Sequence, residues 1–406
     1  MTGKLENLKR ILAIGPATLV SVAYIDPGNF GTNIEAGSKY GLTLLWVIWL
    51  SGAMAIMFQY ISGKVGIVTE KGLLDVSMAK LRKNEKKLYF FGLFIAILAT
   101  DMAEFVGMAV GFHLILGIPL SISAGLSVVD VLLLFLLTED LGRMEIVIAG
   151  LVGIVGLSYL IELVIVHANP EEILMHSFIP YLSGSEMILT ATSIIGATIM
   201  PHAIILHSYL SAEKSAGKGG INKKGEIKNH LKETLVNLGG ASLVNAAIQI
   251  MSYYAFYLKG LTNITSLESA YYTLAPLFGA LASWIFAISL FSSGLSSSMV
   301  SVIAGVKILE SYFGTPTKQW KVRLMLRLIN MVPFLIAVYL GVDMMSILVY
   351  TQAILSFSLP LVLFPLINIS KDGNLMGGYK ISKPLYVISL VSTVFIVLIN
   401  IAMFVF

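Results

Sequence analysis

The sequence predicts an all-α polytopic membrane protein, and three observations lead to that fold class. Of its 406 residues, 57% are hydrophobic and only 12% are charged, and the mean hydropathy is +0.86, a balance that soluble globular domains do not have. The apolar residues form long continuous runs rather than the alternating pattern of barrel strands. Cysteine is absent, which excludes a disulfide framework and thiolate metal ligands.

Eleven apolar runs are long enough to span a bilayer. The predicted helices cover residues 9–40, 43–63, 88–111, 119–137, 142–166, 185–212, 231–258, 271–309, 321–340, 343–369 and 383–406. Basic residues precede the first run, as in a signal peptide, but no small-residue cleavage site follows it. We therefore expect the first run to be a retained membrane helix.

The basic residues test this count of spans. With the N-terminus in the cytoplasm, 25 of the 27 Lys and Arg residues fall on the cytoplasmic side, and only Lys39 and Lys259 fall outside. This asymmetry follows the positive-inside rule. The sequence thus predicts a multi-pass protein of the cell membrane with its N-terminus inside and its C-terminus outside.

Two of the predicted helices are interrupted in the middle. The first is broken at Asp26-Pro27-Gly28-Asn29 and the sixth at Met200-Pro201. Proline lacks an N–H and disfavours helical backbone at the residue before it, and glycine loosens the backbone further. Interrupted helices in matching halves of a membrane protein indicate a transport site near the bilayer midplane.

The two broken helices each begin a group of five, and the two groups have opposite orientations. This arrangement predicts an inverted repeat of the LeuT type within a single domain over residues 1–406. Repeat one covers about 9–166, repeat two about 184–369, and an extra eleventh helix covers 383–406.

The residues at the breaks have the chemistry of a mixed metal site. Asp26 and Asn29 offer oxygen, Met200 offers a soft thioether, and the unwound turns would free the carbonyls of Ala23 and Ala197. Such a set suits transition metals better than Mg²⁺ or Ca²⁺. Two ordinary interpretations stay open: Asp26 as a helix N-cap, and Met200 as packing filler.

A second group of polar residues indicates a proton route. Asp101 and Glu104 are three apart on one helix face, so at least one should hold a proton near neutral pH. His202 and His207, beyond the second break, are interpreted as proton carriers, although membrane histidines are often only structural. A salt bridge from the carboxylates to Arg327 is the alternative, and it is compatible with a relay.

Several functions are excluded by missing motifs. The sequence has no Walker A, G-x-S-x-G, H-E-x-x-H or Rossmann motif, so we expect no enzyme activity, no ATP drive and no cofactor. The dispersed net charge of +4 does not indicate nucleic-acid binding, and no obligate protein partner is predicted. Two further intramembrane carboxylates, Asp130 and Glu162, have no assigned role.

Taken together, these stretches resemble the Nramp family of divalent-metal transporters. The matching segments are Asp26-Pro27-Gly28-Asn29, Thr100-Asp101-Met102-Ala103-Glu104, Gly196-Ala197-Thr198-Ile199-Met200-Pro201-His202, Leu206-His207-Ser208 and Thr351-Gln352. The similarity runs through all eleven predicted helices.

The resemblance implies a LeuT-type importer of Mn²⁺ or Fe²⁺, and also of Cd²⁺ or Co²⁺, coupled to protons. The implied metal ligands are Asp26, Asn29, Met200, the carbonyls of Ala23 and Ala197, and, in some states, Gln352. The implied proton route contains Asp26, Asp101, Glu104, His202 and Arg327. Thr198 and Asn245 match outer-vestibule positions.

The sequence departs from the family pattern at several core positions. The departures are Leu326 in place of a second adjacent arginine, Ala203 for Asn, Gly294-Leu295-Ser296 where Gln is usual, and Ser358 for a second glutamine. Each removes a polar group that bears on proton coupling more than on metal binding. Met200 argues against the magnesium-transporting relatives, which lack the thioether.

The leading hypothesis is therefore proton-coupled import of divalent transition metals by alternating access through the lipid bilayer. One alternative is an amino-acid or organic-cation symporter of the same fold, and another is a metal transporter with altered or absent proton coupling. A metal sensor that binds without turnover is a third.

Overall fold

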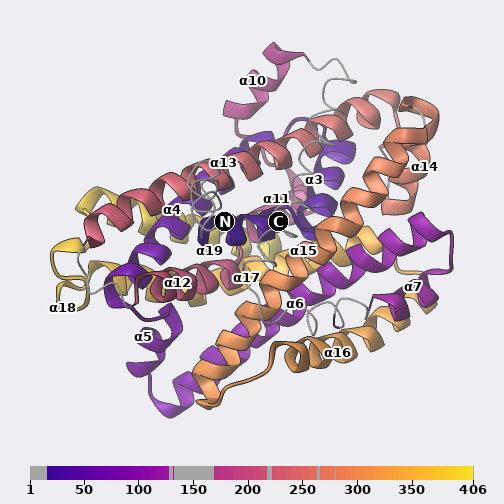
Figure 1. The fold of residues 1–406 in the computed structure, drawn as a ribbon. Helices are drawn as coiled ribbons and strands as arrows, with labels where there is room; N and C mark the ends of the chain where they lie inside the picture. Colours follow the sequence, from indigo (N-terminus) through magenta and orange to yellow (C-terminus); the bar gives the residue numbers. More distant parts are fainter. Residues whose placement is uncertain are drawn as a thin grey trace, which may run out of the picture.

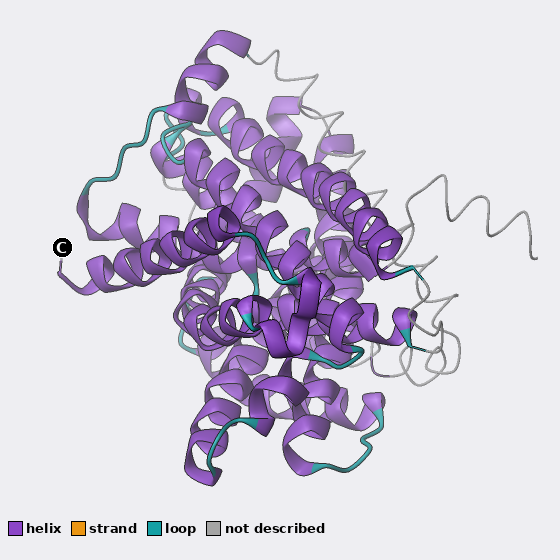
Figure 2. Cartoon of the chain, turned by 90° about the vertical axis from the view of Figure 1, so that its left-hand side faces the viewer, coloured by secondary structure: helices purple, strands orange, loops and turns teal. Residues whose placement is uncertain are grey.

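The computed structural model describes residues 16–127, 131, 169–216, 222–262, 266–278 and 280–405, and all regular structure in these ranges is helical (Figure 2). In chain order the helices are α2 (Pro16–Ser21), η1 (Val22–Tyr24), α3 (Pro27–Tyr40), α4 (Leu45–Thr69), α5 (Leu73–Ala79), α6 (Lys83–Leu116), α7 (Leu120–Leu126), α10 (Pro170–Phe178), α11 (Gly184–Ile199), α12 (Pro201–Ser215), α13 (Lys223–Ala255), η2 (Tyr257–Lys259), α14 (Leu267–Phe278), α15 (Ala280–Phe313), α16 (Gln319–Tyr339), α17 (Met344–Lys371), α18 (Gly373–Met376), η3 (Gly377–Tyr379) and α19 (Lys383–Val405).

The predicted all-α membrane fold is confirmed. Within the described ranges, eight helical segments are long and apolar enough to cross a bilayer. Seven of them match the second, third, sixth, seventh and ninth to eleventh predicted spans, with ends that differ by up to eight residues, and the remaining one, Ser283–Phe313, overlaps only part of the predicted span 271–309. The predicted spans 119–137 and 142–166 lie largely outside the described residues, as do Asp130 and Glu162.

The sixth segment is interrupted at the predicted place, whereas the first is interrupted a few residues earlier than predicted, because Pro27, Gly28 and Asn29 already belong to α3. Between Ser21 and Pro27 the first segment passes through the short 3₁₀ turn η1 before α3 begins. The sixth segment ends as α11 at Ile199 and resumes as α12 at Pro201. The residue between them, Met200, has a φ of 40°, a left-handed conformation that side chains other than glycine rarely adopt.

The prediction of one helix over 271–309 is wrong. The structure has two helices there, α14 and α15, which lie side by side in Figure 1, and the Ser283 hydroxyl donates to the carbonyl of Tyr271 at 2.9 Å. Residues twelve apart on one continuous helix would be about 18 Å apart along its axis. The apolar run hides this reversal, although Pro276 and Gly279 mark it in the sequence.

The short helix α10 was also not predicted. The Asn169 side chain caps it by accepting from the backbone N–H of Glu171 at 3.0 Å, and Pro170 occupies the first position. A cap followed by proline and two acidic residues is a recognisable helix start.

The broken segments lie at the centre of the bundle. α11 packs against α17, α12 against α4, and α13 against α3, while α6 and α15 form the neighbouring pair (Figure 1). Of the most apolar stretch of α11 and α12, 94% is buried, against 28% in α19. The broken helices are therefore enclosed by protein, and α19 is the least enclosed of the eight spans in the described ranges.

Two glycines allow the central helices to approach each other closely. A Cβ at Gly196 of α11 would lie 2.0 Å from the carbonyl oxygen of Gln352 on α17. A Cβ at Gly66 of α4 would lie 2.1 Å from the carbonyl oxygen of Ser208 on α12. Both obstacles are backbone atoms, which cannot turn away as a side chain can. Small residues at such crossings are typical of membrane helix pairs.

We expect Gly196→Ala to lower the melting temperature of the detergent-purified protein, because α11 and α17 would have to separate. Gly239→Ala is the matched control, since a Cβ there meets nothing within 4 Å and alanine favours a helix by about 1 kcal/mol over glycine. Size-exclusion chromatography after heating measures the melting temperatures of both variants. Equal melting temperatures for the two variants would contradict this account of the packing.

Candidate metal centre

The centre begins at Asp26, which is the N-cap of α3. Its Oδ1 atom accepts from the backbone N–H of Asn29 at 2.8 Å, and Pro27 is the first helical residue. Only 1% of Asp26 is exposed. The capping interpretation is thus correct as local geometry, but a cap normally faces solvent, and a carboxylate so deeply buried in a membrane bundle calls for a second role.

Asn29 joins the two helix breaks. Its Nδ2 group donates both to Asp26 Oδ1 at 2.7 Å and to the carbonyl of Ala197 at 2.9 Å. Ala197 lies in the last turn of α11, so the two breaks face each other across one amide side chain. Two residues that the sequence comparison placed in an outer vestibule meet the Asn29 oxygen: Asn245 Nδ2 at 3.2 Å and the Thr198 hydroxyl at 3.5 Å.

The side chain of Gln352 reaches the same place from α17. A Cβ at Gly28 would lie 2.0 Å from Gln352 Nε2 and 2.9 Å from Asp26 Oδ2. Only glycine therefore leaves room for the carboxylate and the amide together. Gln352 is fully buried, and neither of its amide atoms has a hydrogen-bond partner among the described residues. Such an orphaned amide is costly unless it meets a ligand.

Met200 and Ala23 complete the predicted set, and both are buried. Met200 is the one residue between α11 and α12, so the second break places its side chain in the core. Ala23 lies in η1, where the neighbouring carbonyls of Tyr24 and Ile25 are bound by Asn245 at 3.0 Å and by Ser293 at 2.6 Å. The structure thus places Ala23 at the first break and Met200 at the second, and it brings Asp26, Asn29, Ala197 and Gln352 into contact with one another.

Asp101 and Glu104 lie on α6 and share an arginine. Arg323 of α16 donates through Nη1 to Asp101 Oδ1, and the same nitrogen lies 3.3 Å from Glu104 Oε2. All three side chains are completely buried. The predicted ion pair with Arg327 is also present but looser, with Nη1 3.9 Å from Asp101 Oδ1, and the Arg327 guanidinium lies over the Phe105 ring at 4.9 Å.

Sequence reasoning missed four residues of this cluster. Arg323 and Asn330 approach Asp101, with Asn330 Nδ2 at 2.7 Å from Oδ2. Ser297 and Ser301 of α15 donate to the two Glu104 oxygens at 2.9 and 2.7 Å. The signal was present in the spacing: Arg323, Arg327 and Asn330 are at i, i+4 and i+7, which is one helix face.

A stripe of serines on α15 connects the two groups. Ser293 donates to the carbonyl of Ile25, next to Asp26, and Ser297 and Ser301 follow at one-turn intervals to reach Glu104. On the other side, a Cβ at Gly107 of α6 would lie 2.2 Å from the Pro27 ring. The carboxylate pair and the first break are therefore packed directly against common elements.

The two predicted histidines have different surroundings. His202 Nδ1 lies 3.2 Å from the hydroxyl of Thr100, the residue before Asp101. His207 Nδ1 lies 2.8 Å from Gln59 Oε1, and Gln59 Nε2 donates to the Tyr24 hydroxyl at 2.8 Å. The structure thus brings His202 into contact with α6 at the residue before Asp101, whereas His207 belongs to a separate chain of bonds that ends at Tyr24 in η1.

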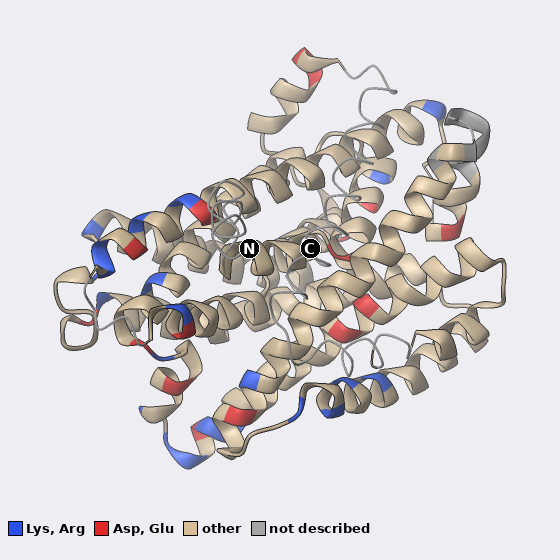
Figure 3. Ribbon diagram, in the orientation of Figure 1, with Lys and Arg blue, Asp and Glu red and all other residues tan. Residues whose placement is uncertain are grey.

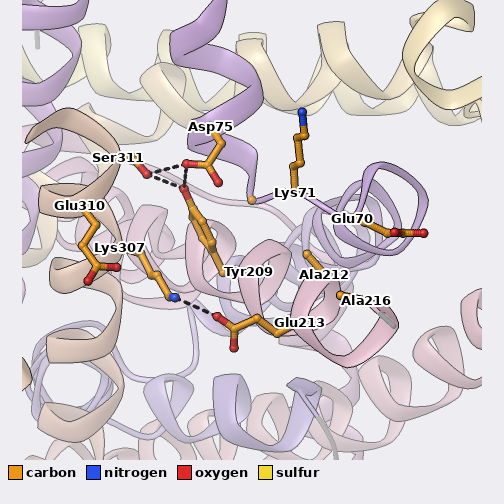
Figure 4. Close-up of a pocket in the computed structure, with 11 residues that line it drawn as sticks. Glu70, Lys71, Asp75, Tyr209, Ala212, Glu213, Ala216, Lys307, Glu310 and Ser311 are labelled. Atoms are coloured by element: carbon orange, nitrogen blue, oxygen red, sulfur yellow. Dashed lines mark hydrogen bonds and ion pairs between the residues drawn. The ribbon is translucent and has the colours of Figure 1, made fainter. Parts of the chain in front are cut away.

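A pocket of about 360 Å³ lies apart from these residues, between α5, α12 and α15 (Figure 4). Its polar groups bind one another: Asp75 accepts from Tyr209 at 2.7 Å and from Ser311 at 2.8 Å, and Lys307 pairs with Glu213 at 2.8 Å. These bonds connect α5, α12 and α15 to one another, so the pocket is a polar contact between helices and not the predicted metal centre.

Comparison with known proteins agrees with this architecture. A family model described as natural resistance-associated macrophage protein-like matches residues 17–406. The divalent metal cation transporter MntH of Aeromonas hydrophila is 36% identical over 376 residues, which cover 91% of this chain and 90% of that protein. The MntH protein of Granulibacter bethesdensis is 38% identical over 385 residues, covering 93% and 85%.

Solved structures of transporters also resemble this chain. The manganese transporter of Eremococcus coleocola, crystallised with an aromatic bis-isothiourea compound, superposes with a TM-score of 0.85 at 26% identity, covering 95% of this chain and 84% of that one. MhsT in complex with L-phenylalanine superposes at 0.69 with 14% identity over 96% and 98%, which shows a common fold alone. The chain therefore belongs to the natural resistance-associated macrophage protein (Nramp) family of membrane transporters, which are not enzymes.

Proposed function

We propose that this protein imports divalent transition metal ions, Mn²⁺ and Fe²⁺ foremost, together with protons by alternating access. The observation that carries the proposal is the meeting of Asp26, Asn29, the Ala197 carbonyl and the orphaned Gln352 amide between two broken helices. The relatives named as divalent metal cation transporters and as a manganese transporter support the same cargo.

The donor set accounts for selectivity. Asp26 supplies one negative charge, and Asn29, Gln352 and the carbonyls of Ala23 and Ala197 supply neutral oxygens. Met200 adds a polarisable sulfur, which binds Mn²⁺, Fe²⁺, Co²⁺ and Cd²⁺ better than Mg²⁺ or Ca²⁺. A metal ion would displace the Asn29 Nδ2 group from Asp26 and Ala197, and the Asn29 amide would have to turn for its oxygen, now facing Asn245 and Thr198, to reach the ion. The bonds that now join the breaks thus hold the ligands in place for the ion.

The carboxylate pair offers a place for the coupled proton. Asp101 and Glu104 lie together with Arg323 in the core, where two carboxylates cannot both remain charged without compensation. Arrival of a divalent ion at Asp26 shifts the local charge, and the Ser293, Ser297 and Ser301 stripe runs from the residue before Asp26 to Glu104, while His202 contacts Thr100 on α6. We propose that protons pass from Asp26 through this region, with Arg327 on the exit side, while His207 lies on the separate chain of hydrogen bonds through Gln59 to Tyr24.

The charge distribution supports insertion in the cell membrane with the basic end in the cytoplasm. Lysine and arginine gather at one end of the bundle, at the lower left of Figure 3, and are sparse at the opposite end. An inside-negative potential then assists the entry of each charge by about 2.3 kcal/mol per 100 mV. The hydrogen bonds of Asp75 with Tyr209 and Ser311 lie at this basic end, and they would have to break before a metal ion could leave to the cytoplasm.

Asp26→Asn should abolish Mn²⁺ uptake into proteoliposomes while leaving the fold intact, because asparagine caps α3 as aspartate does but lacks the charge that binds the ion. Asp343→Asn is the matched control, since Asp343 caps α17 in the same way, with its Oδ1 2.8 Å from the Ser346 N–H. Equal Mn²⁺ uptake by both variants would show that Asp26 only caps α3 and does not bind the ion. Uptake of leucine by the wild type without any metal flux would favour the amino-acid alternative.

Met200→Ala should weaken Cd²⁺ and Mn²⁺ transport by roughly tenfold and relieve the exclusion of Ca²⁺, because the soft ligand is lost. Met251→Ala is the control, being an equally buried methionine of α13 that lies away from the breaks. Uptake is measured for each ion separately. An unchanged ratio of Cd²⁺ to Ca²⁺ transport in Met200→Ala would remove the thioether from the selectivity mechanism.

Glu104→Gln should separate proton flux from metal flux. The carboxamide keeps the shape and can still accept from Ser297 or Ser301, but it cannot take up a proton. We expect Mn²⁺ uptake to continue with much less acidification of an encapsulated pH dye. Glu310→Gln at the basic end, where Glu310 accepts from the Thr317 N–H at 2.9 Å, should retain the wild-type ratio. A wild-type ratio in Glu104→Gln would exclude Glu104 as a proton carrier.

A further inference from the structure

Two imidazole rings meet between α12 and α13, below the proposed metal centre. The ring centroids of His207 and His230 are 4.7 Å apart with the planes at 75°. His207 is fully buried and His230 is 5% exposed. His207 follows Met200 by seven residues, which is about 10 Å along a helix, in the direction of the basic end of the bundle.

The hydrogen bonds fix which nitrogens carry protons. His230 Nε2 lies 3.1 Å from the carbonyl of Tyr60, which can only accept, so Nε2 holds the proton and Nδ1 keeps a lone pair. His207 Nδ1 faces Gln59 Oε1, also an acceptor, so its lone pair is on Nε2. That Nε2 atom is buried and has no hydrogen-bond partner among the described residues.

The surroundings hold the His230 ring in place. A Cβ at Gly63 of α4 would lie 2.2 Å from His230 Cε1, so the absent side chain of this glycine makes room for the imidazole. The Tyr60 ring, also of α4, stacks on the imidazole, with centroids 5.9 Å apart and planes at 13°. A ring fixed in this way presents its free nitrogen with little loss of side-chain entropy.

Both histidines have the second contact that metal-binding histidines require. A ligating imidazole nearly always donates its other N–H to a carbonyl or carboxylate, which orients the ring and increases the basicity of the ligand. Here the Gln59 amide oxygen serves His207 and the Tyr60 carbonyl serves His230. Binding through the remaining nitrogens would leave the Tyr24, Gln59 and His207 chain unbroken.

We infer that His207 and His230 form a second station for the transported transition metal on its way to the cytoplasm. The inference rests on the proposed function for its cargo and direction. Imidazole suits Fe²⁺, Ni²⁺, Cu²⁺ and Zn²⁺ and binds Mn²⁺ more weakly, whereas Mg²⁺ and Ca²⁺ take oxygen ligands, so the station again discriminates against Mg²⁺ and Ca²⁺.

The charges around the pair keep this station weak. Lys214 of α12 is the nearby cation, and its Nζ is paired with Glu233 at 3.1 Å. Lys64 of α4 stacks over Tyr60 at 5.8 Å. No carboxylate hydrogen-bonds to either imidazole among the described residues. Neutral ligands do not offset the charge of the ion, and the two lysines repel it, so the ion is bound weakly. Weak binding is what a site on a transport path requires, because the ion must leave it again.

Pulsed electron paramagnetic resonance of bound Mn²⁺ tests the station, because nitrogen of a ligating imidazole modulates the echo. The purified Asp26→Ala protein, which lacks the first carboxylate, should still show histidine nitrogen coupling at high Mn²⁺ concentration. The coupling should disappear in Asp26→Ala/His230→Phe, which keeps a ring against Tyr60 but no lone pair. It should also disappear in Asp26→Ala/His230→Gln, which checks that loss does not come from the bulk of phenylalanine.

Two controls address the other histidines. His202→Gln and His176→Gln, each on the Asp26→Ala background, should retain the coupling, since His202 contacts Thr100 and His176 lies on α10. Absence of coupling in Asp26→Ala, its persistence in both His230 variants, or its loss with His202→Gln would overturn the inference. Failure of the proposed function would be seen separately, as absence of Mn²⁺ uptake by the wild type.

Discussion

The structure depends on a single constraint, which is that two interrupted helices must face each other inside the membrane without leaving their backbone groups unbound. Hydrocarbon offers no hydrogen bonds, so the ends of broken helices are tolerated only where protein groups serve them. The Asn29 amide does this by binding Asp26 on its own segment and the Ala197 carbonyl on the other. Asn245 and Ser293 serve the carbonyls of Tyr24 and Ile25.

The same constraint explains the glycines at the helix crossings. The α11 break can be served by its neighbours only if α17 comes close, and α17 comes close only because Gly196 has no side chain. Gly28 makes the corresponding space for Gln352 beside Asp26. The polar contacts and the tight packing therefore depend on each other. If α11 and α17 moved apart, the side chains that bind the backbone groups at the helix breaks would move away as well.

The sequence was sufficient for the features that are encoded locally. The breaks at Asp26 and Met200 could be predicted because proline and glycine act on their immediate neighbours. Contacts between distant segments could not be predicted in this way. Arg323 lies 222 residues from Asp101, and nothing in the local sequence shows which α16 residues face α6. The reversal between α14 and α15 was missed because hydrophobicity continues across it, and apolar length alone does not distinguish one helix from two.

Met200 stands in a backbone conformation that costs a residue other than glycine about 1–3 kcal/mol. Glycine would remove that cost but would also remove the sulfur, and a residue branched at Cβ would raise it further. Substitution at this position therefore changes the energy stored in the bend together with the affinity for soft ions that we propose for the site. Evolution toward a different cargo through this residue would alter the ease of helix movement as well.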